Sequence, residues 1–312
     1  MTGTTGVVLM RSGARYRVRT DQGEVSAVLT GRVRWADDDR VVPGDVVDLE
    51  IHTDGPAAIA GVHPRRSVLA RRAVTGERTG RRAQPIAANV DQVVIVAATR
   101  DPEANPRMLD RFFVIAEANG LPSVLVVNKT DLDRTAVATL TRRFAATAYQ
   151  VLPTSVRSGE GLPAFRDLLR GRASVLAGPS GAGKSSLLNA IEPGLGRRVG
   201  EISEKWRTGR HTTSAAELLP LAIGGYVVDT PGIREVGTWG IDPDALAACF
   251  PEMRPYLDQC RFDDCRHLAE PGCAVREAAA AGRIEGDRLL SYERLYAEIS
   301  VPSWSSGRRR GT

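Results

Sequence analysis

The first 63 residues alternate between apolar and polar positions in short stretches that are separated by turn signals. Arginines at positions 15, 17 and 19 alternate with Tyr16 and Val18, which is the period of a strand with one apolar face. The stretches of this kind are Gly6–Met10, Ala14–Thr20, Val25–Leu29 and Val46–Ile51. Several short strands within about 60 residues predict a small β-barrel of the OB-fold type over residues 1–63.

Residues 64–85 form a region of different character. The segment from Arg65 to Arg82 holds seven arginines against one acid, Glu77, and shows neither helical nor strand periodicity. We expect an arginine-rich connector here. Two interpretations stay open: a solvated linker, or a segment that contacts a phosphate backbone.

From residue 86 to 238 apolar runs alternate with helical stretches. The apolar runs, rich in valine and leucine, are Asp91–Ala98, Ser123–Val127, Tyr149–Leu152, Ser174–Ala177 and Tyr226–Val228. The helical stretches are Arg107–Ala118, Asp133–Ala146, Leu162–Leu169 and Lys184–Ile191. This alternation predicts an α/β domain in which helices cover both faces of a parallel sheet.

Residues 239–312 carry all four cysteines, then a helical pattern and a basic tail. The fold class that we predict is therefore multidomain: barrel, connector, α/β domain and C-terminal helical domain. No apolar run reaches the about 18 residues of a membrane span, and the N-terminus lacks the apolar core of a signal peptide. We expect a cytoplasmic monomer with no membrane partner.

Charge adds one observation. The net charge is +5 and the pI is about 9.3, yet only three of the 42 basic residues are lysines. Arginine binds phosphate through a bidentate fork, so the excess suits a phosphate-bearing partner. Coding bias toward arginine explains the same composition, and composition alone does not separate the two interpretations.

Residues 178–185 match the phosphate-binding loop pattern G-x-x-x-x-G-K-[ST], between a predicted strand and a predicted helix. Glycines let backbone N–H groups converge on phosphate, and the helix directs its positive end toward it. Lys184 is expected to reach the β- and γ-phosphates and Ser185 to bind Mg²⁺. The nucleotide-contacting residues predicted here are Gly178, Pro179, Ser180, Gly181, Ala182, Gly183, Lys184, Ser185 and Ser186.

A second motif points to the base. Asn128, Lys129, Thr130 and Asp131 follow a predicted strand and resemble the N-K-x-D element of GTPases. In that element the aspartate accepts hydrogen bonds from guanine N1–H and from the 2-amino group. Adenine offers neither donor, so its binding leaves a buried carboxylate unpaired. The resemblance therefore implies guanine specificity. Thr154-Ser155, after the next strand, resembles the loop that contacts guanine O6.

Two further segments resemble the switches of GTPases. Residues 229–232, Asp-Thr-Pro-Gly, resemble the D-x-x-G element, in which Asp229 holds Mg²⁺ through water and the Gly232 amide contacts the γ-phosphate. Residues 209–213 lie where the first switch is expected, and either Thr212 or Thr213 is expected to close on Mg²⁺ and the γ-phosphate.

The order of the motifs is permuted. Ordinary GTPases place N-K-x-D last, whereas here it precedes the phosphate loop by 50 positions. A circular permutation keeps a fold whose original termini lie close together. It also places the D-x-x-G switch at the end of the domain, a short distance from the cysteine-bearing region. That connection is a route for transmitting the nucleotide state.

The residue after Gly232 is Ile233, where many GTPases carry a glutamine that orients the attacking water. Isoleucine has no hydrogen-bonding group in its side chain, so slow intrinsic hydrolysis is expected. His211 is the candidate catalytic residue in this chain, because an imidazole can orient or deprotonate water. The alternatives for His211 are a solvated side chain and a contact with a partner.

The cysteine region contains the pattern C-x4-C-x-H-x5-C. Cys260, Cys265, His267 and Cys273 supply three thiolates and one imidazole, a closed set suited to one structural Zn²⁺. Cys249 lies in an apolar stretch and is assigned to the core. The alternative interpretation is a set of unliganded core cysteines with a surface histidine.

A small N-terminal barrel, a permuted GTPase domain and this cysteine spacing together resemble the RsgA/YjeQ family, bacterial GTPases stimulated by the small ribosomal subunit. The resemblance implies a GTPase that hydrolyses GTP to GDP and phosphate and acts as a checkpoint in late maturation of that subunit. It also implies contact with 16S rRNA, with the barrel and the zinc domain clamping RNA on either side of the GTPase domain.

Two other functions agree with parts of the sequence. One is a signalling or protein-binding GTPase that does not act on ribosomes, which would not need the barrel or the zinc knuckle. The other is an RNA-binding module with a vestigial nucleotide site. The complete set of nucleotide motifs argues against this second alternative.

Overall fold

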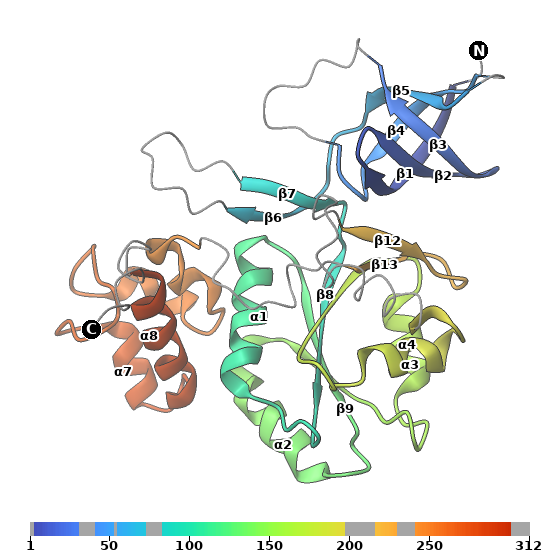
Figure 1. Ribbon diagram of the computed structural model, residues 1–312. Coiled ribbons are helices and arrows are strands. Elements are labelled where there is room, and N and C mark those ends of the chain that lie inside the picture. The colour runs from blue at the N-terminus through green and yellow to red at the C-terminus, as the bar shows by residue number, and fades with distance from the viewer. Residues whose placement is uncertain are drawn as a thin grey trace, which may run out of the picture.

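Three units make up the fold, and they follow one another along the chain. The computed structural model describes residues 3–30, 41–52, 55–72, 83–196, 216–229 and 241–300. Figure 1 shows a barrel at the N-terminal end, a central sheet flanked by helices, and a helical unit beside α1 (Pro106–Ala118). The predicted multidomain fold class is confirmed by this arrangement.

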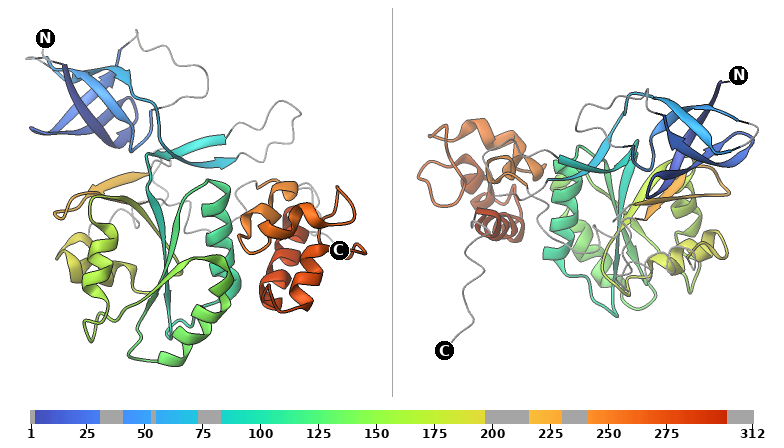
Figure 2. Two further views of the ribbon diagram at one scale, coloured as in Figure 1. Left: turned by 180° about the vertical axis from the view of Figure 1, so that it is seen from behind. Right: turned by 45° about the horizontal axis from the view of Figure 1, so that its top comes forward.

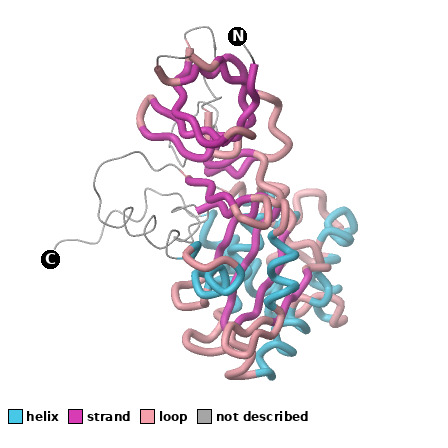
Figure 3. The backbone as a smooth tube through the Cα atoms, turned by 90° about the vertical axis from the view of Figure 1, so that its right-hand side faces the viewer, coloured by secondary structure: helices cyan, strands magenta, loops and turns pink. Residues whose placement is uncertain are grey.

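The N-terminal unit is a closed barrel with the strand order β1-β2-β3-β5-β4, and Figure 3 views it close to its axis. Its strands are β1 (Gly3–Ser12), β2 (Arg15–Thr20), β3 (Gly23–Leu29), β4 (Val46–Glu50) and β5 (Ala57–Val62). The period-2 prediction for β2 is confirmed, because Tyr16 and Val18 are buried inside the barrel. Strand β5 was missed, since alanine and glycine weaken its apolar signal.

The predicted connector is partly wrong. Val68–Arg72 forms β6, which pairs antiparallel with β7 (Ala83–Ala88). Tertiary packing explains the difference, because Leu69 and Ala87 are buried in the core of the central unit. The Ala70 N–H also donates to Asn119 Oδ1 at 2.9 Å. The arginines that surround the strand masked this pattern in the sequence.

The central sheet has six strands in the order β10-β9-β8-β11-β13-β12. Their bounds are β8 (Gln92–Ala98), β9 (Ser123–Asn128), β10 (Gln150–Pro153), β11 (Ala173–Ala177), β12 (Glu217–Pro220) and β13 (Tyr226–Asp229). Five strands are parallel, and β12 runs antiparallel beside β13 at the edge. The prediction of a parallel sheet is therefore wrong at this edge, where a four-residue strand gave no periodic signal.

Helices cover both faces of the sheet, as predicted. Alternate residues of β8 separate into two apolar clusters: Val93 and Ile95 pack with α1, whereas Val94 and Val96 pack with α3 and α4. The remaining helices of this unit are α2 (Arg134–Arg143), η1 (Ala145–Thr147), α3 (Leu162–Leu169) and α4 (Lys184–Ile191). Helix α2 is shorter than expected, because Asp133 caps its start and the chain tightens into a 3-10 turn after Phe144.

The C-terminal unit is helical and lies against α1, as the two views in Figure 2 show. Its elements are η2 (Pro243–Ala245), η3 (Ala247–Cys249), η4 (Arg254–Gln259), α7 (Ala274–Ala280) and α8 (Gly286–Ser300). Val114 of α1 joins its apolar core, which includes Phe250 and Tyr292. Among the described helices, none has the length and apolar character required to cross a membrane.

Candidate nucleotide site and metal centre

The phosphate loop connects β11 to α4, as its sequence pattern predicted. Gly178 has φ +131°, and a Cβ there would stand 2.1 Å from the Val96 carbonyl oxygen. Gly183 has φ +94°, and a Cβ there would stand 2.2 Å from Asn128 Nδ2. Both the backbone conformation and the space therefore require glycine, which lets the loop lie close to β8 and to the N-K-T-D segment.

Lys184 lies in the first turn of α4, with its side chain folded back over the loop. Its Nζ donates to the carbonyl oxygens of Gly178 at 2.6 Å and of Pro179 at 2.7 Å. This conformation keeps the ammonium group over the loop. Ser185 and Ser186, the next two residues of α4, are exposed.

The N-K-T-D segment lies beside the phosphate loop although it precedes it by 50 positions. Only β8 separates the two strands that carry the motifs. Asn128 is buried, and its Nδ2 donates to the Ala182 carbonyl oxygen at 3.0 Å. Its Oδ1 accepts from Thr154 Oγ1 at 3.3 Å. One asparagine therefore ties together three loops: the phosphate loop, its own segment and the loop after β10.

Lys129 and Asp131 point toward different neighbours. Lys129 has φ +61°, its carbonyl oxygen accepts from Thr99 Oγ1 at 2.6 Å, and its Nζ donates to the Asp101 carbonyl oxygen. Asp131 is exposed, and its Oδ1 accepts from Ser155 Oγ at 2.6 Å. The side chain of Asp131 is thus held from one side and presented at the surface.

The structure brings together the predicted base-binding and phosphate-binding residues, but it leaves other predictions untested. Asp229 ends β13, whose backbone pairs with β11 directly before the phosphate loop. Four predicted residues lie outside the described residues, and their roles stay predictions: His211, Thr212, Thr213 and Gly232.

Three residues beside these loops were missed by the sequence analysis: Thr99, Asp101 and Glu160. Thr99 and Asp101 follow β8 and contact Lys129. Glu160 accepts a hydrogen bond from Thr130 Oγ1 at 2.6 Å. Thr99 and Asp101 follow a strand that carries no motif, so only their position at the carboxyl end of the sheet marks them.

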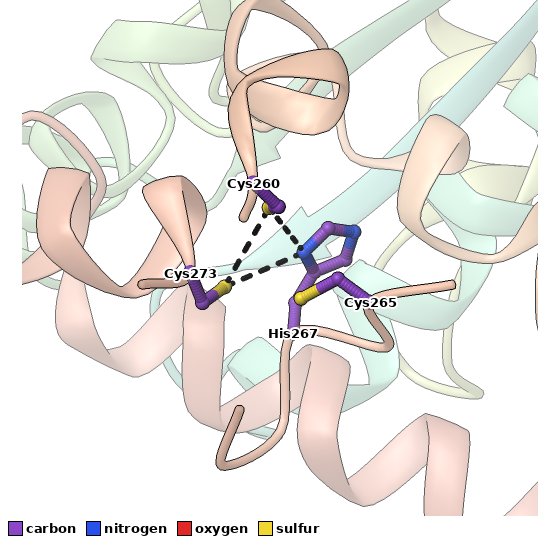
Figure 4. A group of neighbouring side chains, drawn as sticks. All are labelled: Cys260, Cys265, His267 and Cys273. Atoms are coloured by element: carbon purple, nitrogen blue, oxygen red, sulfur yellow. Dashed lines mark hydrogen bonds between the residues drawn. The ribbon is translucent and has the colours of Figure 1, made fainter. Parts of the chain in front are cut away.

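The predicted metal ligands lie together in the C-terminal unit. The ligand atoms of Cys260, Cys265, His267 and Cys273 all lie within 4.8 Å of one another. His267 Nδ1 is 3.5 Å from the sulfurs of Cys260 and Cys273, and these two sulfurs are 4.0 Å apart. Figure 4 shows the four side chains converging from the end of η4, the loop after it and the start of α7.

These distances fit a tetrahedral metal ion. With zinc bonds of about 2.3 Å to sulfur and 2.0 Å to nitrogen, tetrahedral ligands lie about 3.8 Å apart for two sulfurs and about 3.5 Å for sulfur and nitrogen. The donor set therefore matches the chemistry of such a site, and the three distances among Cys260, His267 and Cys273 match its spacing. Cys249 is buried in the apolar core of the unit, as predicted, and is not part of the group.

The protonation state of the group depends on the metal. Burial raises the pKa of the Cys265 thiol to about 12 and also raises that of Cys273, whereas burial lowers the pKa of His267. Without metal, Cys265 and Cys273 therefore stay as neutral thiols near pH 7, and binding a cation releases their protons. Backbone hydrogen bonds hold the surrounding loop, with the Leu268 and Ala269 amides donating to the Glu270 carboxylate at 2.8 and 3.0 Å.

Comparison with known proteins extends over nearly the whole chain. The small ribosomal subunit biogenesis GTPase RsgA of Gemmatimonas aurantiaca is 48% identical over 96% of this chain and 98% of its own length. The protein of the same name from Moorella thermoacetica is 40% identical over 94% of this chain and 97% of its own.

Two solved structures have the same fold. YjeQ from Thermotoga maritima matches with a TM-score of 0.79 and 33% identity, over 99% of this chain and 100% of that one. YloQ, described as a circularly permuted GTPase, matches with a TM-score of 0.74 and 27% identity, over 99% and 98% of the two chains.

The family profile named RsgA GTPase matches residues 62–239, more than half of the chain. That span contains the phosphate loop and the N-K-T-D segment in the permuted order described above. The cysteine group lies outside it, in the part of the chain that the full-length relatives also cover. The chain is therefore a GTP hydrolase and belongs to the RsgA GTPase family.

Proposed function

We propose that this GTP hydrolase is activated by the small ribosomal subunit and acts as a checkpoint in late maturation of that subunit. The observation that carries the proposal is the extent of the similarity to proteins named small ribosomal subunit biogenesis GTPases. It spans the barrel and the metal unit as well as the GTPase domain. A GTPase domain needs no flanking units to bind and hydrolyse nucleotide. Because this chain and the named relatives share the flanking units in the same order, we infer that they share a macromolecular partner.

Guanine recognition is assigned to the N-K-T-D segment. The exposed Asp131 carboxylate would accept hydrogen bonds from guanine N1–H and the 2-amino group, while Ser155 holds its Oδ1. Lys129 would pack beside the base, and Asn128 and Thr130 brace the segment from the buried side. This assignment favours GTP over ATP, because adenine presents no donor pair to the carboxylate.

The phosphates are assigned to the loop from Gly178 to Ser186. Backbone N–H groups of the loop would surround them, and Lys184 would exchange its carbonyl partners for the β- and γ-phosphates. Mg²⁺, when bound, neutralises charge on these phosphates. Ser185 and, through water, Asp229 would hold that ion. Outside the described residues, Thr212 or Thr213 and the Gly232 amide would close on the γ-phosphate.

Hydrolysis requires a positioned water. Ile233 follows the D-x-x-G element and its side chain has no group that could orient water. We assign that role to His211, whose imidazole can orient or deprotonate the nucleophile. In this account the free protein turns over slowly, and binding to the small subunit places His211 for catalysis.

The cysteine group is assigned to one structural Zn²⁺. Three thiolates and one imidazole fill a tetrahedral shell, which leaves no open position for substrate. Holding the loop and the start of α7 in one geometry is then the function of the ion. A rigid knuckle at the end of the chain suits a unit that contacts RNA by shape.

The partner surface is assigned to 16S rRNA. Arg15 and Arg19 are exposed on the outer face of β2, where they can pair with phosphates. We assign the protein to the cytoplasm, because bacterial ribosomes assemble there. We expect it to act as a monomer. GTP would favour the RNA-bound state and hydrolysis would release the protein.

The test is binding to purified ribosomal subunits by co-sedimentation. With a non-hydrolysable GTP analogue, the protein should sediment with small subunits, less so with GDP, and not with large subunits. Binding should also weaken as salt rises, because phosphate contacts release counterions. Lys184→Ala is the matched control. It should remove the difference in small-subunit binding between the GTP analogue and GDP. Equal binding to both subunits, or no effect of nucleotide, would favour a GTPase with protein partners instead.

A further inference from the structure

Glu160 links two loops of the proposed guanine site. It lies in the loop after β10, and its Oε2 accepts hydrogen bonds from Thr130 Oγ1 at 2.6 Å and from Arg134 at 3.0 Å. Thr130 is 1% exposed and stands between Lys129 and Asp131. A buried hydroxyl in the base-binding segment is therefore satisfied by a carboxylate from another loop.

The same loop also contacts Asp131, through Ser155 at the opposite end of the loop from Glu160. The Ser155 N–H donates to the Glu160 carbonyl oxygen at 2.9 Å, and Ser155 Oγ accepts from the Ser158 amide at 3.1 Å. That hydroxyl donates in turn to Asp131 Oδ1 at 2.6 Å. Two neighbouring residues of the base-binding segment, Thr130 and Asp131, are thus tied to the two ends of one short loop.

This closed ring explains how an exposed carboxylate can be held in one orientation. Packing cannot fix Asp131, because its side chain is exposed. The hydrogen bond from Ser155 fixes one oxygen, and the Thr130–Glu160 bond fixes the backbone from which the side chain projects. A hydrogen bond to an ionised acceptor is stronger than one between neutral groups, and its loss leaves a buried hydroxyl unpaired.

We propose that Glu160 is a positioning residue for guanine recognition, which sets base selectivity through Thr130 and Asp131 without touching the nucleotide. The proposal rests on the guanine site assigned above. It predicts that losing Glu160 weakens those contacts that Asp131 makes with the base, and affects the phosphate contacts less. Selectivity between bases should therefore change more than overall nucleotide affinity.

The test compares binding of GDP and IDP to the full-length protein. Hypoxanthine lacks the 2-amino group, so IDP makes one contact fewer with Asp131. Glu160→Ala should weaken GDP binding by about tenfold and IDP binding less, which lowers the GDP-to-IDP preference. Glu160→Gln keeps an oxygen that can accept from Thr130 and should restore most of the preference. Thr130→Val removes the same bond from the opposite side and should match Glu160→Ala.

Arg134→Ala is the matched control. Arg134 pairs with the same carboxylate but is 76% exposed, so its loss should change GDP affinity by less than about twofold. If Glu160→Ala and Thr130→Val leave the GDP-to-IDP preference unchanged, or weaken both nucleotides equally along with the melting temperature, Glu160 is only a structural brace and the proposal fails. Asp131→Ala distinguishes this failure from a wrong guanine site: if it keeps the wild-type preference, both assignments fail.

Discussion

The GTPase domain meets its two neighbours through junctions of different chemistry. On the barrel side the contact is mainly apolar: Leu9 of β1 is fully buried in the same cluster as Leu218 of β12. In the described part of the chain, the ion pair of Arg17 with Glu217 adds to it, and the Arg17 side chain is 39% exposed. The Ala88 N–H also donates to the Pro43 carbonyl oxygen at 2.9 Å, and Asn89 Nδ2 donates to the Gly44 carbonyl oxygen at 2.8 Å. The barrel therefore rests on the edge strand that pairs with β13, the strand ending at Asp229.

On the C-terminal side the junction contains a buried ionic network. Arg288 of α8 is 1% exposed and donates to Asp110 Oδ1 of α1 and to Glu252 Oε1, both at 2.6 Å. Burial alone would lower the pKa of Arg288, but the two carboxylates raise it above its usual value. Arg143 of α2 donates to the other oxygen of Asp110 at 2.6 Å.

The difference between the two junctions suggests different mechanical roles. Apolar contacts are non-directional and tolerate small displacements, whereas a buried ionic network is satisfied in few geometries. The C-terminal unit is therefore fixed in orientation on α1 and α2. We expect the barrel to be held less firmly in orientation, because the ion pair across its junction, Arg17 with Glu217, is partly exposed.

The largest effect is expected from removing the proposed zinc ion, because structural zinc contributes about 10–16 kcal/mol of apparent binding free energy in small domains. Chelation, or Cys265→Ser, should unfold the C-terminal unit while the GTPase domain still binds GDP. Circular dichroism measures the loss of helix, and a GDP-binding assay measures the state of the GTPase domain.

Cys249→Ala is the control, because Cys249 lies outside the ligand group and the variant should keep the metal. A loss of GDP binding in parallel with the helical signal would mean that the two units are not separable.

A smaller effect is expected from Arg288→Ala, which leaves the buried Glu252 without its partner and Asp110 with Arg143 alone. The free energy of unfolding should fall by about 3–5 kcal/mol, measured by urea denaturation. The matched change at the other junction is Arg17→Ala, which should cost less than about 1 kcal/mol because that pair is partly exposed. Equal losses for the two variants would contradict the contrast between the junctions.

Sequence patterns predicted much of this fold, and the misses share a cause. The valine-rich strands β8 and β9 and the helices beside them were evident because burial on both faces leaves a continuous apolar run. Strands β5, β6, β7 and β12 were missed because each has only four to six residues, with few or small apolar side chains. Periodicity in a single sequence does not detect strands of that kind.

The candidate site shows the same division. The phosphate loop and N-K-T-D were found because each needs particular residue types in consecutive positions. The candidate metal ligands were found because cysteine and histidine at close spacing have few other uses. Glu160 and Thr99 were not predicted, because a carboxylate or hydroxyl that braces a loop does not belong to a motif with a fixed spacing. The Arg288 network joins three segments that are distant in the sequence, so no sequence pattern predicted it.

The most direct test of the central claim is GTP turnover by the purified protein, alone, with small ribosomal subunits and with large subunits as the control. Alone, the rate should lie between about 10⁻⁴ and 10⁻² s⁻¹, the range of unassisted GTPases. Small subunits should raise it by about tenfold or more, and large subunits should not change it. An unchanged rate with small subunits would contradict the ribosomal assignment while leaving the nucleotide site in place.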